Sequence, residues 1–284
     1  MRLLTLCLAL AAPVAAQSRI PSHWERVGTL PIDEASGISV SRQYAGIFWV
    51  HDDSGDLPRV HAVRQTGELV ATFDIQGARA VDWEDITLGP CPWDLTRTCL
   101  ILGDIGDNLE TRTRVILYFV EEPDPTRPGD SARTIGPAHS VRVRYADRPH
   151  DAEGLAVDPQ GNVSIVTKGR TGPILRYVLT RAELMADSAV AVPRDTLAII
   201  PQRMLGRWVT AASIHPDGRQ AVVKTYTEIY FYRIEAGQWI PDGQPCFIGP
   251  REAQGEAIDF LADELLILAS ERGVGEPAIH LTRC

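Results

Sequence analysis

The sequence predicts an all-β fold, a single β-propeller, on three observations. A short apolar pattern recurs five times, each recurrence is followed by more strand-like segments, and helical patterns are almost absent. The 20 prolines and 23 glycines interrupt the chain at turn spacing. We therefore expect five blades, with six as the alternative if the insertion at 123–139 holds more than a loop.

The five repeats share the start of their first strand. The matching segments read EASGISVS, DWEDITLG, DAEGLAVDPQGN, WVTAASIHPDGR and QGEAIDFL. One position is equivalent in all five, occupied by Ser36, Glu84, Glu153, Thr210 and Glu256. Two residues upstream stand Glu34, Asp82, Asp151, Trp208 and Gln254. Because the first strand of each propeller blade lines the axis, these side chains are expected around one end of a central channel.

The last repeat has too few strands to complete a blade. Each earlier repeat continues with segments for a second, third and fourth strand, but the chain ends after the third strand of the last one. The segment Trp24–Ile32, which precedes the first repeat, has strand composition. Since an unpaired strand edge is a liability, we expect this N-terminal strand to complete the last blade and close the ring.

The first sixteen residues are predicted to be a signal peptide. Met1-Arg2 is basic, Leu3–Ala12 is an apolar run too short to cross a bilayer, and Val14-Ala15-Ala16 supplies small residues for cleavage. No later segment is long and apolar enough for a membrane span. We expect residues 17–284 to form one exported domain, monomeric in the periplasm or the medium.

The cysteines fit an oxidising compartment. Outside the predicted signal peptide there are four, and an even number in an exported protein favours two disulfides. Cys91 and Cys99 flank a turn-rich stretch, so a local bridge is expected there, and Cys246–Cys284 follows by elimination. A zinc site is the alternative, but the cysteines lack the close paired spacing of such sites.

The composition excludes some partner classes. Hydrophobic residues make up 44% of the chain and the formal net charge is −9. An acidic protein is a poor partner for nucleic acid or an anionic membrane surface, since both attract positive charge. The charge is compatible with a bound cation. The expected partner is a small anionic molecule, with an unidentified protein or glycan as the alternative.

Acidic residues are expected to meet on one face of the propeller. Antiparallel neighbours alternate direction, so the starts of the first strands and the ends of the second strands lie at the same end. Hard oxygen ligands crowded in this way suit a divalent cation, Ca²⁺ best. The predicted metal ligands are Glu84, Glu153, Glu256, Asp104 and Asn108. Alternatively, these acids accept hydrogen bonds from neighbouring blades and hold the ring together, and the GDIGDN loop is only turn-forming.

Basic residues and histidines complete the predicted face. Lys168 and Lys224 end the second strands of consecutive repeats, where earlier repeats carry acids, and His51 and His150 lie near the same end. We take these four as candidate catalytic residues of a metal-dependent hydrolase acting on a small ester, lactone or phosphate ester. The alternative is a non-catalytic recognition module that uses an aromatic and polar rim near Trp49, Trp83, Trp208 and Tyr226, the bases only neutralising the acids.

The strand starts EASGIS, DWEDIT, AEGLAVDPQGN and GEAIDF resemble those of secreted propellers. The similar groups are the calcium-dependent propellers around regucalcin and the gluconolactonases, and the phytase-like propellers. The resemblance implies a propeller fold and a strand-start glutamate that helps to hold a divalent ion on the axis. The matching positions are Glu84, Glu153 and Glu256. The chain departs from the gluconolactonase group in its five repeats and in lacking the Asn-Asp pair in the usual order, so the resemblance concerns fold more than lactonase activity.

Overall fold

The computed structural model describes residues 19–53, 55, 57–127, 133–273 and 275–284. Regular structure there is β-strand apart from three short 3₁₀ turns, η1 (Glu183–Met185), η2 (Arg203–Leu205) and η3 (Gly249–Arg251). The all-β prediction is therefore confirmed. None of the described residues belongs to a helix that could cross a membrane. The predicted signal peptide, residues 1–16, lies outside the described residues.

The first strand group follows the chain in simple antiparallel order. It consists of β2 (Ala35–Val40), β3 (Phe48–Asp52), β4 (Arg59–Val63) and β5 (Leu69–Ile75). A short strand from the insertion at 123–139, β9 (Arg133–Ile135), pairs in parallel with β5 at the outer edge. The described part of that insertion thus extends an existing sheet.

The second and third groups are joined into one eight-stranded sheet. The second contains β6 (Trp83–Cys91), β7 (Asp94–Asp104), β8 (Val115–Glu121) and β10 (His139–Tyr145). The third contains β11 (Ala152–Val157), β12 (Val163–Thr167), β13 (Leu175–Leu179) and β14 (Ser188–Thr196). Their outermost strands, β10 and β14, pair in parallel.

The fourth and fifth groups bring the two ends of the chain together. The fourth contains β15 (Val209–Ile214), β16 (Gln220–Thr225), β17 (Glu228–Glu235) and β18 (Gln238–Pro241), with β19 (Cys246–Phe247) also on β17. The fifth contains β20 (Gly255–Ala262), β21 (Leu265–Ser270), β22 (Ala278–Arg283) and the N-terminal β1 (His23–Thr29). β1 pairs antiparallel with β22, His23 lying opposite Arg283.

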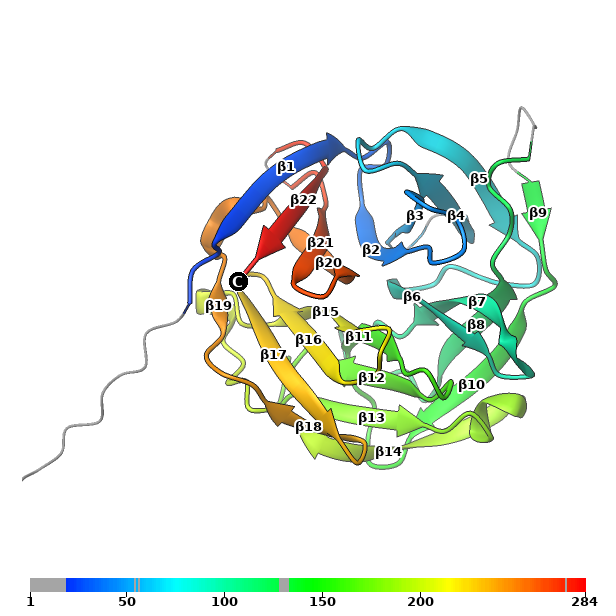
Figure 1. The fold of residues 1–284 in the computed structure, drawn as a ribbon. Coiled ribbons are helices and arrows are strands. Elements are labelled where there is room, and N and C mark those ends of the chain that lie inside the picture. Colours follow the sequence, from blue (N-terminus) through cyan, green and yellow to red (C-terminus); the bar gives the residue numbers. More distant parts are fainter. Residues whose placement is uncertain (1–18, 54, 56, 128–132, 274) are drawn as a thin grey trace, which may run out of the picture.

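The innermost strands of the five groups surround the centre of the molecule (Figure 1). In the order β2, β6, β11, β15 and β20, each packs against the next, and β20 packs against β2. Hydrophobic cores lie between neighbouring groups. For example, Trp49 and Phe73 of the first group pack with Trp83 and Tyr118 of the second. The expectation that Trp49 and Trp83 lie at the rim is therefore wrong, because both are buried in this core. Each inner strand is thus held from both sides, which fixes its position at the centre.

Every inner strand carries a register irregularity at its start. The shifts fall between Ala35 and Gly37, Trp83 and Asp85, Ala152 and Gly154, Val209 and Ala211, and Gly255 and Ala257. A β-bulge takes one residue out of the ladder and re-aims its side chain. The residues left out are Ser36, Glu84, Glu153, Thr210 and Glu256. They are the five that the repeat alignment made equivalent.

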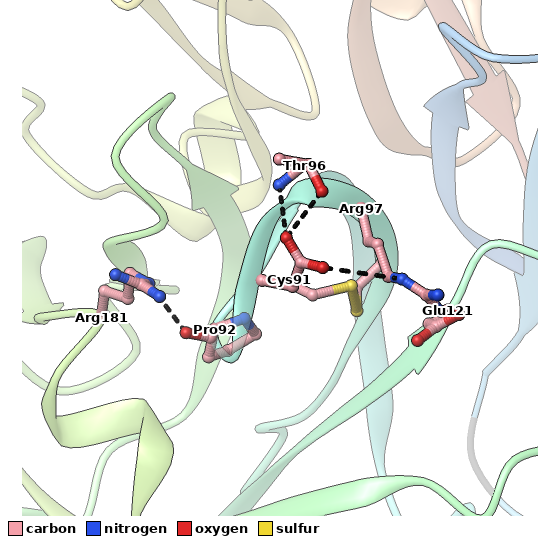
Figure 2. Close-up of a disulfide and its surroundings, with 8 residues drawn as sticks. Cys91, Pro92, Thr96, Arg97, Glu121 and Arg181 are labelled. Atoms are coloured by element: carbon pink, nitrogen blue, oxygen red, sulfur yellow. Dashed lines mark hydrogen bonds and ion pairs between the residues drawn. A yellow bond between two sulfur atoms is a disulfide. The ribbon is translucent and has the colours of Figure 1, made fainter.

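Both predicted disulfides are present, Cys91–Cys99 and Cys246–Cys284. Figure 2 shows the first, at the end of the β6–β7 hairpin, where Arg97 pairs with Glu121 and Arg181 Nε donates to the Pro92 carbonyl at 2.7 Å. Because β6 runs from Trp83 to Cys91, this bond lies at the opposite end of the strand from Glu84. It fixes the hairpin without taking part in the acidic face.

Candidate functional site

Five carboxylates meet at the bulged end of the inner strands. One oxygen from each of Asp53, Asp82 and Glu84 lies within 4.8 Å of the others, and the same holds for Glu84, Asp151 and Glu153. Glu84 and Glu153 are only 5% and 2% exposed. We call these five residues the axial carboxylate cluster. Glu84 belongs to both triads and is its centre.

Gly106, which has no side chain, leaves space for the Glu84 and Asp82 carboxylates. A Cβ added to Gly106 would lie 2.1 Å from Glu84 Oε1 and 2.6 Å from Asp82 Cγ. Real Cβ atoms do not approach other atoms so closely, so any side chain at this position would displace the two carboxylates. Gly106 belongs to the segment that follows β7. The second strand group therefore supplies Asp82 and Glu84 and also the space for their carboxylates.

Lys168 lies beside the buried glutamates of the cluster. It follows β12, is buried, and its Nζ pairs with Glu153 Oε1. Burial lowers the pKa of Lys168, but the charges of Glu153 and Glu84 outweigh burial and the pKa is raised. Lys168 therefore stays protonated and partly neutralises the carboxylates.

Burial and mutual repulsion raise the pKa values of the acids. The pKa of Glu84 is raised by burial and by the charges of Glu153 and Asp53, and the pKa of Glu153 is raised by burial and by Glu256 and Asp151, against the opposing effect of Lys168. Burial and Asp53 raise the pKa of Asp82 to about 6. Carboxylates this crowded gain from any positive charge placed among them.

Glu256 and Glu271 lie beside the cluster. Glu256 is buried, Tyr226 and Gln254 form hydrogen bonds with it, and its Oε2 has no partner in the described part of the chain. Glu271 accepts a hydrogen bond from Gln254 Nε2 at 2.6 Å. Burial and the charges of Glu256 and Asp53 raise the pKa of Glu271 to about 8. These two acids extend the group of carboxyl side chains toward β20 and β21.

The predicted ligands Asp104 and Asn108 differ in burial. Asp104 is fully buried behind the cluster, where Oδ1 accepts hydrogen bonds from the Asp82 amide at 3.2 Å and pairs with Arg112 at 2.8 Å. Its Oδ2 has no partner among the described residues. Asn108 is exposed, and its Oδ1 accepts a hydrogen bond from Arg170. Asp104 supports the backbone that carries Asp82, whereas Asn108 lies at the rim.

The predicted bases do not all reach the cluster. Lys224 is fully buried, with Nζ 3.0 Å from Glu252 Oε2 and 2.7 Å from the Gly255 carbonyl. A Cβ on Gly255 would lie 2.4 Å from that Nζ. Lys224 therefore holds the start of β20, just before Glu256, and its ion pair lies outside the axial carboxylate cluster.

His51 and His150 both lie in packed surroundings. His51 is fully buried against the edge of Trp83, its Nδ1 is 2.8 Å from the Asp52 carbonyl, and its Nε2 has no partner among the described residues. Burial lowers its pKa to about 4, so the ring is neutral. The Nε2 of His150 lies 2.7 Å from the Tyr177 hydroxyl and 2.9 Å from Asp147 Oδ2. The contacts of His150 lie outside the axial carboxylate cluster.

One side of the rim is positively charged. Arg170 Nε pairs with Asp151 Oδ2 at 2.7 Å, and its guanidinium lies 4.9 Å from the centre of the Trp208 ring. Arg203 lies 5.3 Å and Lys168 6.0 Å from the same ring. A half-buried tryptophan beside three cations offers a flat surface and positive charge to an anionic ligand.

Two other buried acids at the centre hold the ring together. Asp85 Oδ2 accepts the amides of Leu155 at 2.8 Å and Ala212 at 3.4 Å, which belong to two other strand groups. Asp259 accepts the Val40 amide at 2.7 Å and the Ser213 hydroxyl at 2.6 Å. Hydrogen bonding between strand groups, the alternative interpretation of the acids, therefore applies to Asp85 and Asp259.

Sequence reasoning placed Asp82 and Asp151 on this face without assigning them as ligands. The signal was present, since both stand two residues upstream of the equivalent glutamates. Asp53 directly follows β3, the second strand of the first group, and second-strand ends lie at this same end of the inner strands. The space beside Gly106 had no counterpart in the repeat pattern, because the other repeats do not continue with a matching loop.

No protein-family model and no curated protein matches this chain. Among solved structures it is similar to the soluble aldose sugar dehydrogenase of Escherichia coli in its apo form, with 11% identity, 92% of this chain and 99% of that chain covered, and a TM-score of 0.52. A glucose dehydrogenase gives 10% identity, the same coverage and a TM-score of 0.52. A gluconolactonase from Xanthomonas campestris gives 12% identity, 95% coverage of both chains and a TM-score of 0.47. The likeness to the two dehydrogenases is one of fold, and the propeller resemblance predicted from the strand starts is confirmed at that level.

Proposed function

We propose that the five strand groups are the five blades of one exported propeller domain, residues 17–284, closed by β1 after removal of residues 1–16. The cyclic packing of the inner strands and the pairing of β1 with β22 support the ring. The two disulfides support an oxidising compartment.

At the centre of this ring the axial carboxylate cluster binds one divalent cation, with Ca²⁺ as the best match. The position of Glu84 in both carboxylate triads is the observation that carries this proposal. The donors are hard oxygens at flexible spacing, which Ca²⁺ prefers. Glu256 Oε2, buried and unpartnered within the described residues, is a further oxygen beside them. Glu84 and Glu153, with Asp82 and Asp151, are the proposed ligands. Asp104 and Asn108 support them.

The proposed reaction is hydrolysis of a small anionic ester, lactone or phosphate ester. A bound cation supplies charge that polarises the group to be cleaved. Arg170 and Trp208 orient the anionic part of the substrate at the rim, and Lys168 opposes the protonation of Glu153. Lys224 positions the start of β20. His51 and His150 are the proposed proton acceptors. His51 would accept at Nε2, because its Nδ1 donates to the Asp52 carbonyl, and His150 would accept at Nδ1, because its Nε2 donates to Asp147.

Calcium titration of the purified full-length protein tests the cation site. After treatment with EDTA, calorimetry should show one Ca²⁺ site in the wild type, and Glu84→Gln should weaken binding at least about a hundredfold, beyond the effect of outer-shell changes. Glu68→Gln, an exposed position with the same charge change, is the matched control. Equal Ca²⁺ binding by wild type and Glu84→Gln would refute the site. A screen of esters, lactones and phosphate esters with and without EDTA then tests hydrolysis.

A second candidate function is recognition without catalysis. The packed surroundings of both histidines and the cations around Trp208 favour it. In this case the rim binds an anionic peptide, glycan or protein, and the cation only stiffens the centre. Substrate turnover that EDTA abolishes and Ca²⁺ restores would exclude this function, whereas ligand binding that survives EDTA without turnover would support it.

A further inference from the structure

A groove on the outside of the molecule lies where the second and third strand groups join. Here β10 and β14, the outermost strands of their groups, run parallel, with Arg142 opposite Ser188 and Arg144 opposite Val190. The groove has a volume of about 620 Å³ and is lined by Arg114, Arg142, Arg144, Glu183 and small or apolar residues of 186–190. In Figure 1 these two strands lie on the outer side of the ring, away from the inner strands.

The fold forces the three arginines together. Arg142 and Arg144 alternate with the buried Val141, Val143 and Tyr145, so both lie on the outer face of β10. β8 pairs antiparallel with β10 and Val115 lies opposite Val143, which places Arg114, one residue earlier, beside Arg144. Like charges at facing positions destabilise a sheet. This arrangement therefore costs stability unless an anion lies nearby.

Among the described residues, no acidic side chain pairs with these arginines. In the part of the chain that the structure describes, none of the three arginines forms an ion pair; Arg144 Nη1 donates to the Tyr145 carbonyl at 3.3 Å. Glu183 lines the groove, but its Oε2 accepts hydrogen bonds from the Thr180 amide and hydroxyl at 2.8 and 2.7 Å. On a chain with a net charge of −9, this is an uneven concentration of positive charge.

We propose that this groove binds a small oligoanion, a ligand carrying two or more phosphate or sulfate groups. The guanidinium group presents a planar fork of donors that matches tetrahedral oxyanions. The volume lies within the range of small-molecule sites, about 300 to 1,000 Å³. Val190 and Ala189 offer apolar surface to the carbon skeleton between the charged groups. This site is independent of the axial carboxylate cluster and of any reaction there.

Calorimetric titration of the full-length protein with tripolyphosphate in low salt tests this site. We expect one binding event that weakens as NaCl is added and that EDTA treatment of the protein leaves unchanged. The double variant Arg142→Gln/Arg144→Gln should lose at least about tenfold in affinity, a difference of about 1.4 kcal/mol. The control Arg64→Gln/Arg219→Gln makes the same charge change at exposed positions elsewhere and should bind as the wild type does.

Two further arms identify the source of the anion. Titration with a sulfated disaccharide tests a free ligand. Flotation with vesicles of cardiolipin, whose headgroup carries two phosphates, and phosphatidylcholine tests a lipid. Binding on either arm that the double variant loses supports the site. Thermal melting checks the fold, and the free double variant should melt no lower than the wild type because like charges are removed. If it melts lower, Arg114→Gln serves as the second variant. Absence of binding on every arm, or equal binding by the arginine variants, would overturn the proposal.

Discussion

Two adjacent acids, Glu84 and Asp85, show how one strand start can serve both structure and chemistry. Asp85 accepts backbone amides from two other strand groups and has its hydrogen bonds satisfied within the ring. Glu84, left out of the ladder by the bulge, directs its carboxylate to the axial carboxylate cluster, where its neighbours are other acids. The residue in the ladder is therefore expected to matter for stability and the bulged residue for binding.

Substitution of Asp85 separates these roles. Asp85→Ala leaves the amides of Leu155 and Ala212 without their acceptor, and we expect a loss of about 2–4 kcal/mol in the free energy of unfolding. Urea denaturation followed by circular dichroism measures it. Glu84→Gln is the matched comparison and should leave the stability of the metal-free protein unchanged or higher, because it removes repulsion. A neutral Asp85→Ala combined with a strongly destabilised Glu84→Gln would reverse the two roles.

The repeat alignment predicts the position of a residue only where the alternation of apolar residues around it recurs in every repeat. Ser36 and Thr210 were aligned with the three glutamates although they differ in chemistry, because the apolar alternation around them is shared. Lys224 was expected at the acidic face, but its pairing with Glu252 depends on a loop that has no equivalent in the other repeats. Side-chain partners from irregular loops do not follow a repeat, so the alignment could not supply them.

At the scale of elements, the bulge is the feature that turns a repeated strand into a site. The alignment identified the bulged position five times, but a strand pattern does not reveal that one residue leaves the ladder. The loop after β7 then adds the missing condition, since Gly106 leaves the space for the Glu84 and Asp82 carboxylates. The cluster therefore needs both the bulge in β6 and a glycine in the loop after β7.

Gly106→Ala tests this dependence without changing any charge. The added Cβ would displace Glu84 and Asp82, so we expect the Ca²⁺ affinity measured by calorimetry to fall by on the order of tenfold or more. Gly172→Ala is the control, because its Cβ would meet only the flexible end of Arg148 at 3.3 Å. Identical Ca²⁺ affinity in both variants and the wild type would show that the Gly106 space does not shape the site.

At the scale of the whole molecule, the central acids link stability to pH and to cations. A carboxyl group whose pKa is raised on folding binds more protons folded than unfolded, so stability falls as pH rises from its ordinary pKa to the raised value. For Glu271 that interval runs from 4.5 to about 8. His51 and His280, whose pKa values burial lowers to about 4, act in the opposite sense below their ordinary 6.5. Between pH 6.5 and 8, the pH dependence of stability therefore reports the raised pKa values of the acids without a contribution from these two histidines.

Thermal melting across this interval gives a direct test. The EDTA-treated protein should melt at a lower temperature at pH 8 than at pH 6.5, and Ca²⁺ should raise the melting temperature more at pH 8, where fewer protons compete for the carboxylates. Glu271→Gln should flatten the pH dependence of the metal-free protein. A melting temperature that rises from pH 6.5 to 8 without metal would contradict the raised pKa values.

The strands themselves were more predictable from the sequence than the pairing between neighbouring strand groups. Five repeats, two disulfides and a strand at Trp24–Ile32 could be read from apolar periodicity and cysteine spacing, because both are local properties. The parallel pairing of β10 with β14 could not, since it depends on how two neighbouring groups are tilted in the finished fold. The arginine groove follows from that pairing and was therefore invisible in the repeats.

The pairing of β1 with β22 also determines when the fifth strand group can form during synthesis. β1 leaves the ribosome well before β22, so the fifth strand group stays incomplete until residue 283 has been made. Until then β1 must wait as an unpaired edge, and contacts this distant in sequence form slowly. A nascent chain therefore contains all five inner strands before β22 is available, and β1 and β22 must lie on the same side of any membrane before they can pair.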